Sequence, residues 1–208
     1  MENDIKKTDE NDAIKLSKIS KDGFRALIVQ ESEKKVELNP WINRYELLSK
    51  RIMTLKMWIK NDGYDYKLID SVRLMERDKK DVAKKIVELL SNNAIYRDAC
   101  RLLEVENSVE LAILTVELPL YLPITRLKGL LGYTPDKNEG RYDRRLRNHI
   151  TRFPVNLYVN TKKRVNVLDK TVEIVNNLLK EKAIYRLELM TLKALGKAYL
   201  LTVNPTSR

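Results

Sequence analysis

Apolar side chains recur every three or four residues over two long stretches in the first half of the chain. In the first stretch the spacings are 3, 4, 3 and 4, at Tyr45, Leu48, Ile52, Leu55 and Ile59. In the second they are 4, 3, 4, 3, 4 and 3, at Leu68, Val72, Met75, Lys79, Val82, Ile86 and Leu89. This heptad spacing and the intervening Asn-Asp-Gly breaker predict an antiparallel helical hairpin, either as part of an ordinary core or as a rod that dimerises. Asn39 and Pro40 are expected to cap and begin its first helix.

The residues before this hairpin carry weaker patterns. Residues 1–22 are polar and are interpreted as a tail. Residues 24–30 and 35–38 combine β-branched and apolar side chains around a polar turn, which predicts a small β-hairpin. Trp41 and Trp58 fall on or beside the heptad seam, so we expect both to anchor a core rather than to stack on bases.

The second half of the chain predicts shorter helices separated by capping and breaking residues. They are expected over residues 94–103, 107–118 and 124–131, from about Arg141 onward, and twice more after Leu168. Asn107 or Ser108 is expected to cap the second helix, and Gly132 to close the third. The last helix is apolar on most of its sides, so we expect it to be buried centrally or in an oligomer contact.

Together these elements predict a mainly α fold. The expected regions are a polar tail with the β-hairpin over 1–39, a coiled-coil-like helical hairpin over 40–93, a basic helix-hairpin-helix-like region over 94–165 and packing helices over 166–208. The composition agrees, because 43% hydrophobic and 33% charged residues with only six Gly and six Pro favour a helix-rich globular protein.

The composition also excludes several kinds of chemistry. Cys100 is the only cysteine and His149 the only histidine, which removes most zinc sites, Cys–His pairs and histidine-based triads. We therefore assign no catalytic residue, metal or cofactor. No apolar run approaches the roughly 18 residues that span a bilayer. The first residues are polar and lack a secretion signal, so we expect a cytoplasmic protein without a membrane partner.

The net charge of +11 is concentrated in one part of the chain. Residues 1–123 hold 22 basic and 22 acidic side chains, residues 124–168 hold 11 and 3, and residues 169–208 hold 7 and 4. An excess confined to one short segment is typical of a surface that binds a polyanion, and nucleic acid is the leading candidate.

On a helical wheel of residues 141–153, apolar and arginine side chains separate onto two faces. The face that we expect to pack carries Tyr142, Leu146, Ile150 and Phe153. The other face is expected to contact the phosphate backbone, because the planar guanidinium fork binds phosphate with two hydrogen bonds. The expected nucleic-acid-binding residues are Arg141, Arg144, Arg145, Arg147 and Arg152 on this face, joined by Lys162, Lys163, Arg164, Arg126 and Lys128.

Other side chains in this segment have a structural interpretation beside a functional one. Asn148 among the arginines is placed to approach adenine, although a solvated position is the favoured interpretation. His149 is expected to lose its charge beside the arginines and to have a structural role. The acids Asp136, Glu139 and Asp143 are expected to be loop and salt-bridge residues rather than Mg²⁺ ligands.

Several motifs follow one another in a recognisable order. A heptad-bearing hairpin precedes a short-helix pair ending in ENSVELAILTVEL, and then come RLKGLLGYTPDKNEGRYDRRLRNHITRF and a closing MTLKALGKAYLL. This order resembles the C-terminal half of RNA-guided insertion-sequence transposases, a family with a resolvase-like acidic catalytic domain, a coiled coil and a C-terminal helix-hairpin-helix serine domain. Residues 130–135 look like that family's Gly-Leu and Pro block, and residues 141–156 look like its basic run.

The resemblance covers residues 66–203 and implies DNA handling without cleavage chemistry. Glu139-Gly140 stands where the family has its catalytic serine before a glycine, and no hairpin glycine occurs around residues 105–108. About 40 residues precede the coiled coil, which is too few for the resolvase-like domain. We therefore expect a non-catalytic DNA-binding protein related to transposases.

Two other functions stay open as alternatives. One is a structural nucleoprotein, such as a virion or chromatin coat that packages DNA, and the other is an active transposase or recombinase. RNA is an alternative to DNA as the partner. The heptad helices or the apolar last helix predict a homo-oligomer, with a dimer favoured. The richness in Lys, Glu, Ile and Tyr is typical of a hot-growing source.

Overall fold

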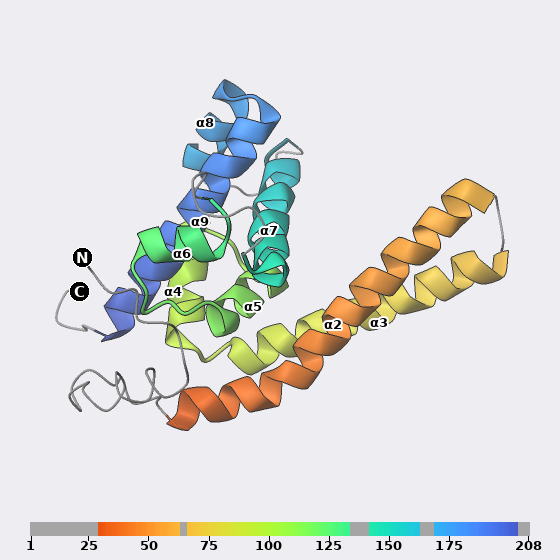
Figure 1. Cartoon of the computed structure of the whole chain (residues 1–208), viewed down its shortest axis with the longest axis horizontal. Helices are drawn as coiled ribbons and strands as arrows, with labels where there is room; N and C mark the ends of the chain where they lie inside the picture. Colours follow the sequence, from red (N-terminus) through yellow and green to blue (C-terminus); the bar gives the residue numbers. More distant parts are fainter. Residues whose placement is uncertain (1–28, 63–65, 134–141, 163–168, 204–208) are drawn as a thin grey trace, which may run out of the picture. The chain divides into compact units, whose positions relative to one another are not determined.

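The part of the chain that the structure describes is mainly helical. A computed structural model describes residues 29–62, 66–133, 142–162 and 169–203, and no strand occurs among them. The helices of this part (Figure 1) are α2 (Val29–Asp62), α3 (Tyr66–Leu90), α4 (Ala94–Leu103), α5 (Val109–Glu117), α6 (Ile124–Leu130), α7 (Arg144–Lys162), α8 (Asp169–Asn177) and α9 (Lys180–Val203). The expected mainly α fold is therefore confirmed. Among these same residues, no helix has the length and hydropathy that crossing a bilayer requires.

The chain divides into two compact units, Met1–Glu37 and Leu38–Arg208. Of the first unit, the structure describes only the beginning of α2. The second unit holds a hydrophobic cluster to which buried residues from α2 through α9 contribute. The candidate site and the core that supports it lie in this second unit.

Helix α2 begins earlier than the sequence pattern predicted. Residues 35–38, expected as a strand, are helical, and Pro40 lies inside the helix rather than at its first turn. The segment is rich in Glu and Lys, which favour helix. Leu38 and Ile42 are both buried and lie four residues apart, so one buried face of the helix runs past the proline. The other expected strand, residues 24–30, lies mostly outside the described residues.

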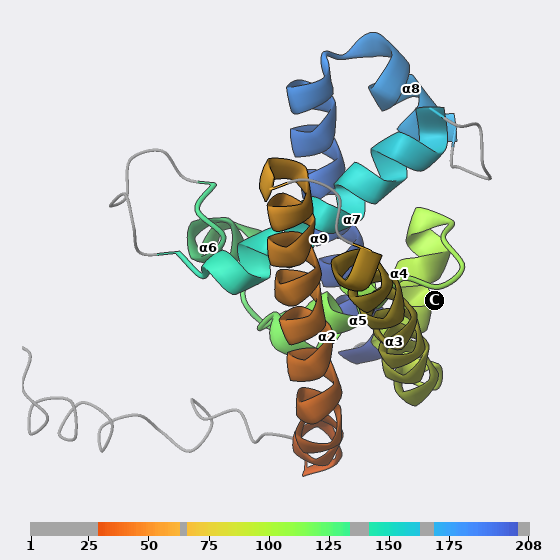
Figure 2. The same cartoon turned by 90° about the vertical axis from the view of Figure 1, so that its right-hand side faces the viewer.

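Helices α2 and α3 use the predicted seam for packing. The seam residues that are buried are Tyr45, Leu48, Ile52, Val72, Val82 and Ile86. Ion pairs from Arg44 to Asp78 (2.8 Å) and from Lys56 to Glu76 (2.6 Å) join the two helices, which lie side by side in Figure 2. Because four of these seam residues belong to the hydrophobic cluster, the seam continues the core of the second unit. Its use in a dimer stays a prediction.

The two tryptophans of α2 have different surroundings. Trp41 is half-buried and packs against the hydrophobic cluster, as expected. Trp58 is 52% exposed, so the expectation of a core anchor is wrong there. Leu55 and Ile59 are only half-buried. Burial along the seam therefore weakens toward the end of α2, and Trp58 lies beyond the part that is fully covered.

Capping residues set the boundaries of the short helices. The side-chain oxygen of Ser108 accepts a hydrogen bond from the backbone N–H of Leu111 at 3.2 Å, which confirms Ser108 as the cap of α5. Asn93 caps α4 in the same way, through the backbone N–H of Tyr96. Gly132 follows α6 with a φ of +73°, a conformation that glycine adopts without strain, so its expected role in closing this helix is confirmed.

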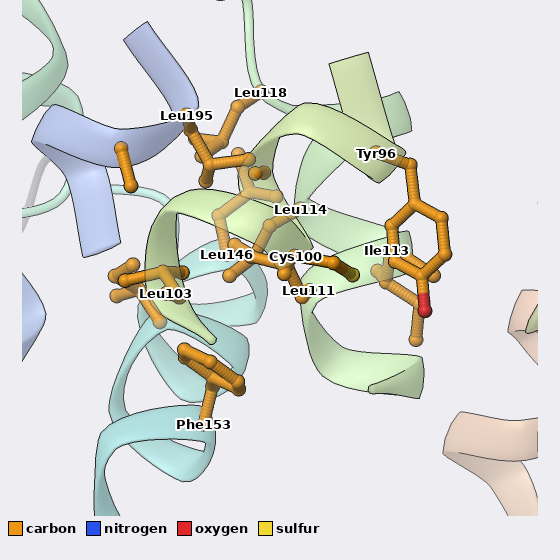
Figure 3. Packing of buried hydrophobic residues seen from close by; sticks show 14 of the residues in the cluster. Tyr96, Cys100, Leu103, Leu111, Ile113, Leu114, Leu118, Leu146, Phe153 and Leu195 are labelled. Atoms are coloured by element: carbon orange, nitrogen blue, oxygen red, sulfur yellow. The ribbon is translucent and has the colours of Figure 1, made fainter. Parts of the chain in front are cut away.

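Helix α9 packs against more of the other helices in the second half of the chain than its neighbours do. It contacts α4, α6, α7 and α8. Figure 3 shows Leu195 of α9 among buried side chains of α4, α5 and α7. Leu187, Leu192 and Ala198 are also fully buried. This confirms the expected central burial of the last helix and leaves one side of α9 to face solvent.

Candidate nucleic-acid interface

Arg145, one of the expected phosphate-binding residues of α7, is bound to carboxylates. Its Nε lies 2.6 Å from Oε1 of Glu46, and its Nη1 lies 3.3 Å from Oε2 of Glu117. Partial burial works against the charge of the guanidinium, but the two carboxylates outweigh it and raise the pKa of Arg145. Glu46 belongs to α2 and Glu117 to α5, so Arg145 ties α7 to two other helices.

Arg147 is held on another side of α7. Its guanidinium carbon lies 3.9 Å from the centre of the Tyr133 ring, and its Nη2 lies 3.5 Å from Oε2 of Glu188 on α9. Glu188 is buried, so Arg147 neutralises a charge that is costly to leave unpaired. The expectation of a single outward arginine face is therefore wrong for Arg145 and Arg147. A helical wheel tells which residues share a face, but not which helices pack there.

The remaining expected residues have varied surroundings. Arg126 and Arg144 are exposed, and Lys128 is half-buried. Lys162 is exposed near the end of α7, and Arg152 is half-buried at the wall of a cavity. The residues that lie outside the described part of the chain are Arg141, Lys163 and Arg164.

Of the three acids in this basic segment, the structure describes only Asp143. Oδ1 of Asp143 accepts hydrogen bonds from the backbone N–H groups of Arg145 (2.9 Å) and Leu146 (3.0 Å), so this side chain caps α7. Asp136 and Glu139 lie outside the described residues. Among the residues that the structure does describe, no group of three or more His, Cys, Asp and Glu side chains is arranged to hold a metal ion.

His149 is buried between two carboxylates. Its Nδ1 is hydrogen-bonded to Oε2 of Glu110, and its Nε2 lies 2.9 Å from Oε1 of Glu46. Burial favours the neutral ring, but the hydrogen bonds and charges of the two carboxylates outweigh it and raise the pKa of His149. The expectation that this ring loses its charge is therefore wrong, because carboxylates and not arginines are its nearest charged neighbours.

Tyr45 extends these contacts into a buried ion network. Its hydroxyl donates to Oε1 of Glu110 at 2.9 Å, and burial followed by the charge of Glu110 raises the pKa of Tyr45. Burial alone would raise the pKa of Glu46. The hydrogen bonds from His149 and Arg145 outweigh burial and hold this pKa below its usual value. We call Tyr45, Glu46, Glu110, Arg145 and His149 the buried ion network. It joins α2, α5 and α7.

The solvent-facing side of α9 carries a row of basic side chains. Lys182, Arg186, Lys193 and Lys197 are exposed, and at about 100° per residue they fall within about 60° of one another. No acidic residue of α9 falls in this sector, in which Leu200 is the other side chain. None of the four basic residues forms an ion pair with another described residue. We call these four residues the α9 stripe.

Helix α6 contacts α9, and the beginning of α7 is held against the end of α6. A Cβ built at Gly196 of α9 would lie 4.0 Å from Ile124 of α6, and Figure 1 shows α6 alongside α9. The backbone N–H of Asp143 donates to the carbonyl of Leu130 at 3.0 Å, which holds the start of α7 against the end of α6. We define the basic face as the α9 stripe together with Arg126, Lys128 and Arg144.

The α9 stripe was not among the residues that sequence analysis nominated. The count of seven basic and four acidic side chains over residues 169–208 gave no reason to look there. That count treats Glu181 and Glu188 as neighbours of the lysines, although Glu181 falls outside the sector of the stripe and Glu188 is buried against Arg147. A helical wheel of residues 180–203 contains the pattern and was the signal to use.

Comparisons with known proteins identify no relative of this chain. No family model, curated protein or solved structure matches the chain. The functional conclusion therefore depends on the charges, contacts and exposure of the side chains described above.

Proposed function

We propose that this chain is a non-catalytic DNA-binding protein that contacts the phosphate backbone through the basic face. The observation that carries the proposal is the α9 stripe, in which four exposed cations share one side of a helix without an acidic neighbour in their sector. Binding to phosphates neutralises such cations and releases the counterions of the DNA, which favours association. A relationship to transposases is part of the proposal and is supported by the motifs at residues 130–135 and 190–201.

The dimensions of the α9 stripe suit a contact with several phosphates. The stripe covers 15 residue steps, from Lys182 to Lys197, and so extends about 22 Å along the helix axis. Successive phosphates of one DNA strand rise about 3.4 Å, so the stripe runs past about six of them. Arg126, Lys128 and Arg144 add three charges on the neighbouring helices. With all seven cations engaged, the logarithm of the binding constant should fall with the logarithm of salt concentration at a slope of about −6.

The residue types of the stripe favour backbone contact over base readout. Three of its four members are lysines, which act as point charges toward phosphate and lack the fork that recognises guanine. Phosphate contacts position a protein on the duplex but carry no direct sequence information. We therefore expect affinity that varies little among DNA sequences of equal length.

The test is a salt titration of binding to a labelled DNA duplex, followed by fluorescence anisotropy. One variant replaces the whole α9 stripe with glutamine, at Lys182, Arg186, Lys193 and Lys197. Because four phosphate contacts are removed, its slope should be shallower than that of the wild type by about 3.6, with at least a tenfold loss of affinity. The same titration with an RNA duplex establishes which nucleic acid is preferred.

A charge-matched variant separates the basic face from a general effect of net charge. It replaces four exposed residues of α2 and α3 with glutamine, at Lys50, Lys60, Arg77 and Lys80. Both variants lose three lysines and one arginine, so their net charges are equal. The proposal requires the matched variant to keep the wild-type slope. Equal losses in both variants, or a wild type whose binding does not depend on salt, would reject it.

A further inference from the structure

A cavity of about 250 Å³ lies where α2, α3, α5 and α7 meet. Its walls include Tyr45, Lys79, Arg152 and Asn156, all of them in the described part of the second unit. The basic face is built from α6, α9 and the first residue of α7. The cavity is therefore a separate place, and an inference about it does not depend on the proposed function.

Two cations of this cavity lack a carboxylate partner of their own. Lys79 and Arg152 are both half-buried, and neither forms an ion pair with another described residue. The Nζ of Lys79 lies 4.8 Å from the centre of the Tyr45 ring, which forms one wall. The three acids of α3 nearest to Lys79 in sequence are paired with other cations. Asp78 is paired with Arg44 at 2.8 Å, Asp81 with Lys84 at 3.8 Å and Glu76 with Lys56 at 2.6 Å.

The one carboxylate that lines the cavity is already engaged. Glu110 accepts the hydroxyl hydrogen of Tyr45 and is hydrogen-bonded to the ring of His149, so its charge is balanced within the buried ion network. Burial lowers the pKa of Lys79, and the nearby charge of Arg152 adds to this, while Glu110 opposes it. The cavity therefore holds two partly desolvated positive charges that a bound anion would stabilise.

We propose that this cavity binds a phosphate-type oxyanion between Arg152 and Lys79. The guanidinium of Arg152 supplies a planar pair of donors, and the ammonium group of Lys79 supplies a point charge with three donors. The amide of Asn156, at the exposed edge of the cavity, supplies a neutral donor. The oxyanion comes either from free phosphate in solution or from one phosphate group of a nucleic acid.

The experiment is isothermal titration of the full-length protein with inorganic phosphate, with sodium chloride adjusted to hold ionic strength constant. We expect one saturable site in the wild type. Lys79→Gln and Arg152→Gln should each raise the dissociation constant at least tenfold, because each removes one of the two charges. Lys80→Gln is the matched control, since Lys80 is exposed and adjacent to Lys79 on α3. It should bind phosphate as the wild type does.

Thermal unfolding followed by circular dichroism establishes whether each variant is folded. If one of the two variants does not fold, the other still tests the proposal. The proposal is overturned if phosphate gives no more heat than matched chloride. It is equally overturned if folded Lys79→Gln and Arg152→Gln proteins bind phosphate as tightly as Lys80→Gln does.

A competition experiment identifies the source of the oxyanion. If nucleic-acid phosphate occupies the cavity, saturating inorganic phosphate should weaken DNA binding more than matched chloride does, and Arg152→Gln should abolish the difference. If DNA binding is unaffected, the cavity is a site for free phosphate. Phosphate binding is measured in the absence of DNA, and the variant without the α9 stripe should retain it. The phosphate result can therefore be interpreted even if the protein does not bind DNA.

Discussion

Helices α7 and α9 both carry several exposed or partly exposed basic side chains, but among the described residues only those of α7 form ion pairs with carboxylates of other helices. On α7, Arg145 is bound by Glu46 and Glu117, and Arg147 is bound by Glu188. On α9, the four residues of the α9 stripe face solvent without an ion pair to another described residue. Rows of similar charge therefore have different uses. Arg145 and Arg147 of α7 hold helices together, while the four cations of the α9 stripe face solvent.

The difference follows from what each helix packs against. The solvent-facing side of α9 lies opposite the core residues that contact α4 and α7, so no acid from another described element reaches it. The corresponding side of α7 is approached by α2, which brings Glu46, and by the end of α5, which brings Glu117. A guanidinium bound to partly buried carboxylates must break those bonds before it contacts phosphate, which costs more than using a solvated cation.

The largest effect is expected from a substitution in the buried ion network, which holds α7 to α2 and α5. Glu110→Ala removes the partner of both His149 and the Tyr45 hydroxyl. Because it leaves buried polar groups unpaired, we expect the free energy of unfolding to fall by about 3 to 5 kcal/mol. Urea unfolding followed by circular dichroism measures this. The control Glu106→Ala changes an exposed acid and should stay within about 0.5 kcal/mol of the wild type. Equal effects of the two changes would contradict the structural role of the network.

The pH dependence of stability gives a second test of the buried ion network, through the protonation of His149. The folded protein holds the proton of His149 more tightly than the unfolded chain, because the pKa is raised above its ordinary value of about 6.5. This contribution to stability is fully present below pH 6.5 and is lost as the pH rises through the folded pKa. The stability difference between the wild type and His149→Gln should therefore be largest below about pH 6.5 and shrink as the pH rises above that value. A difference that is constant or grows with pH would show that the ring is not protonated in the folded state.

Paired arginine variants compare the two helices directly. Arg145→Gln should lower the free energy of unfolding by about 1 to 2 kcal/mol, because it removes hydrogen bonds to two carboxylates at a partly exposed position. It should leave the salt slope of DNA binding unchanged. Arg186→Gln should have the opposite profile, with stability within about 0.5 kcal/mol of the wild type and a slope shallower by about 0.9. If both variants change the slope equally, the two rows do not differ in use.

The fold was predictable from the sequence wherever the pattern is local. The heptad spacing located the buried side of α2 and α3. Of the residues that bound the short helices, Ser108 was one of two candidates for the start of α5, and Gly132 was expected at the end of α6. Pro40 was misread because a proline is a strong local signal for a helix start. The buried face formed by Leu38 and Ile42 depends on packing, and it outweighed that signal.

The candidate site was less predictable because its decisive contacts are distant in sequence. Glu46 lies 99 residues before Arg145, and the composition of residues 124–168 does not predict that the two side chains pair. The α9 stripe has the opposite character. Its pattern is local and visible on a helical wheel, but the expectation that α9 is largely apolar drew attention to its buried side. Net charge therefore singled out residues 124–168, while packing decides which helices present their cations to solvent.

The smallest expected effects concern two glycines that border α6 and so position part of the basic face. An alanine Cβ at Gly132 would lie 2.9 Å from the Tyr142 ring on a backbone with φ of +73°. Gly132→Ala should therefore lower the free energy of unfolding by about 1 kcal/mol. The matched change Gly196→Ala meets only ordinary contact with Ile124 and gains helix propensity, so stability should rise by up to about 1 kcal/mol. Thermal unfolding of both variants gives the comparison. Destabilisation by Gly196→Ala would contradict the ordinary contact between Gly196 and Ile124 and would mean that α6 packs more tightly on α9.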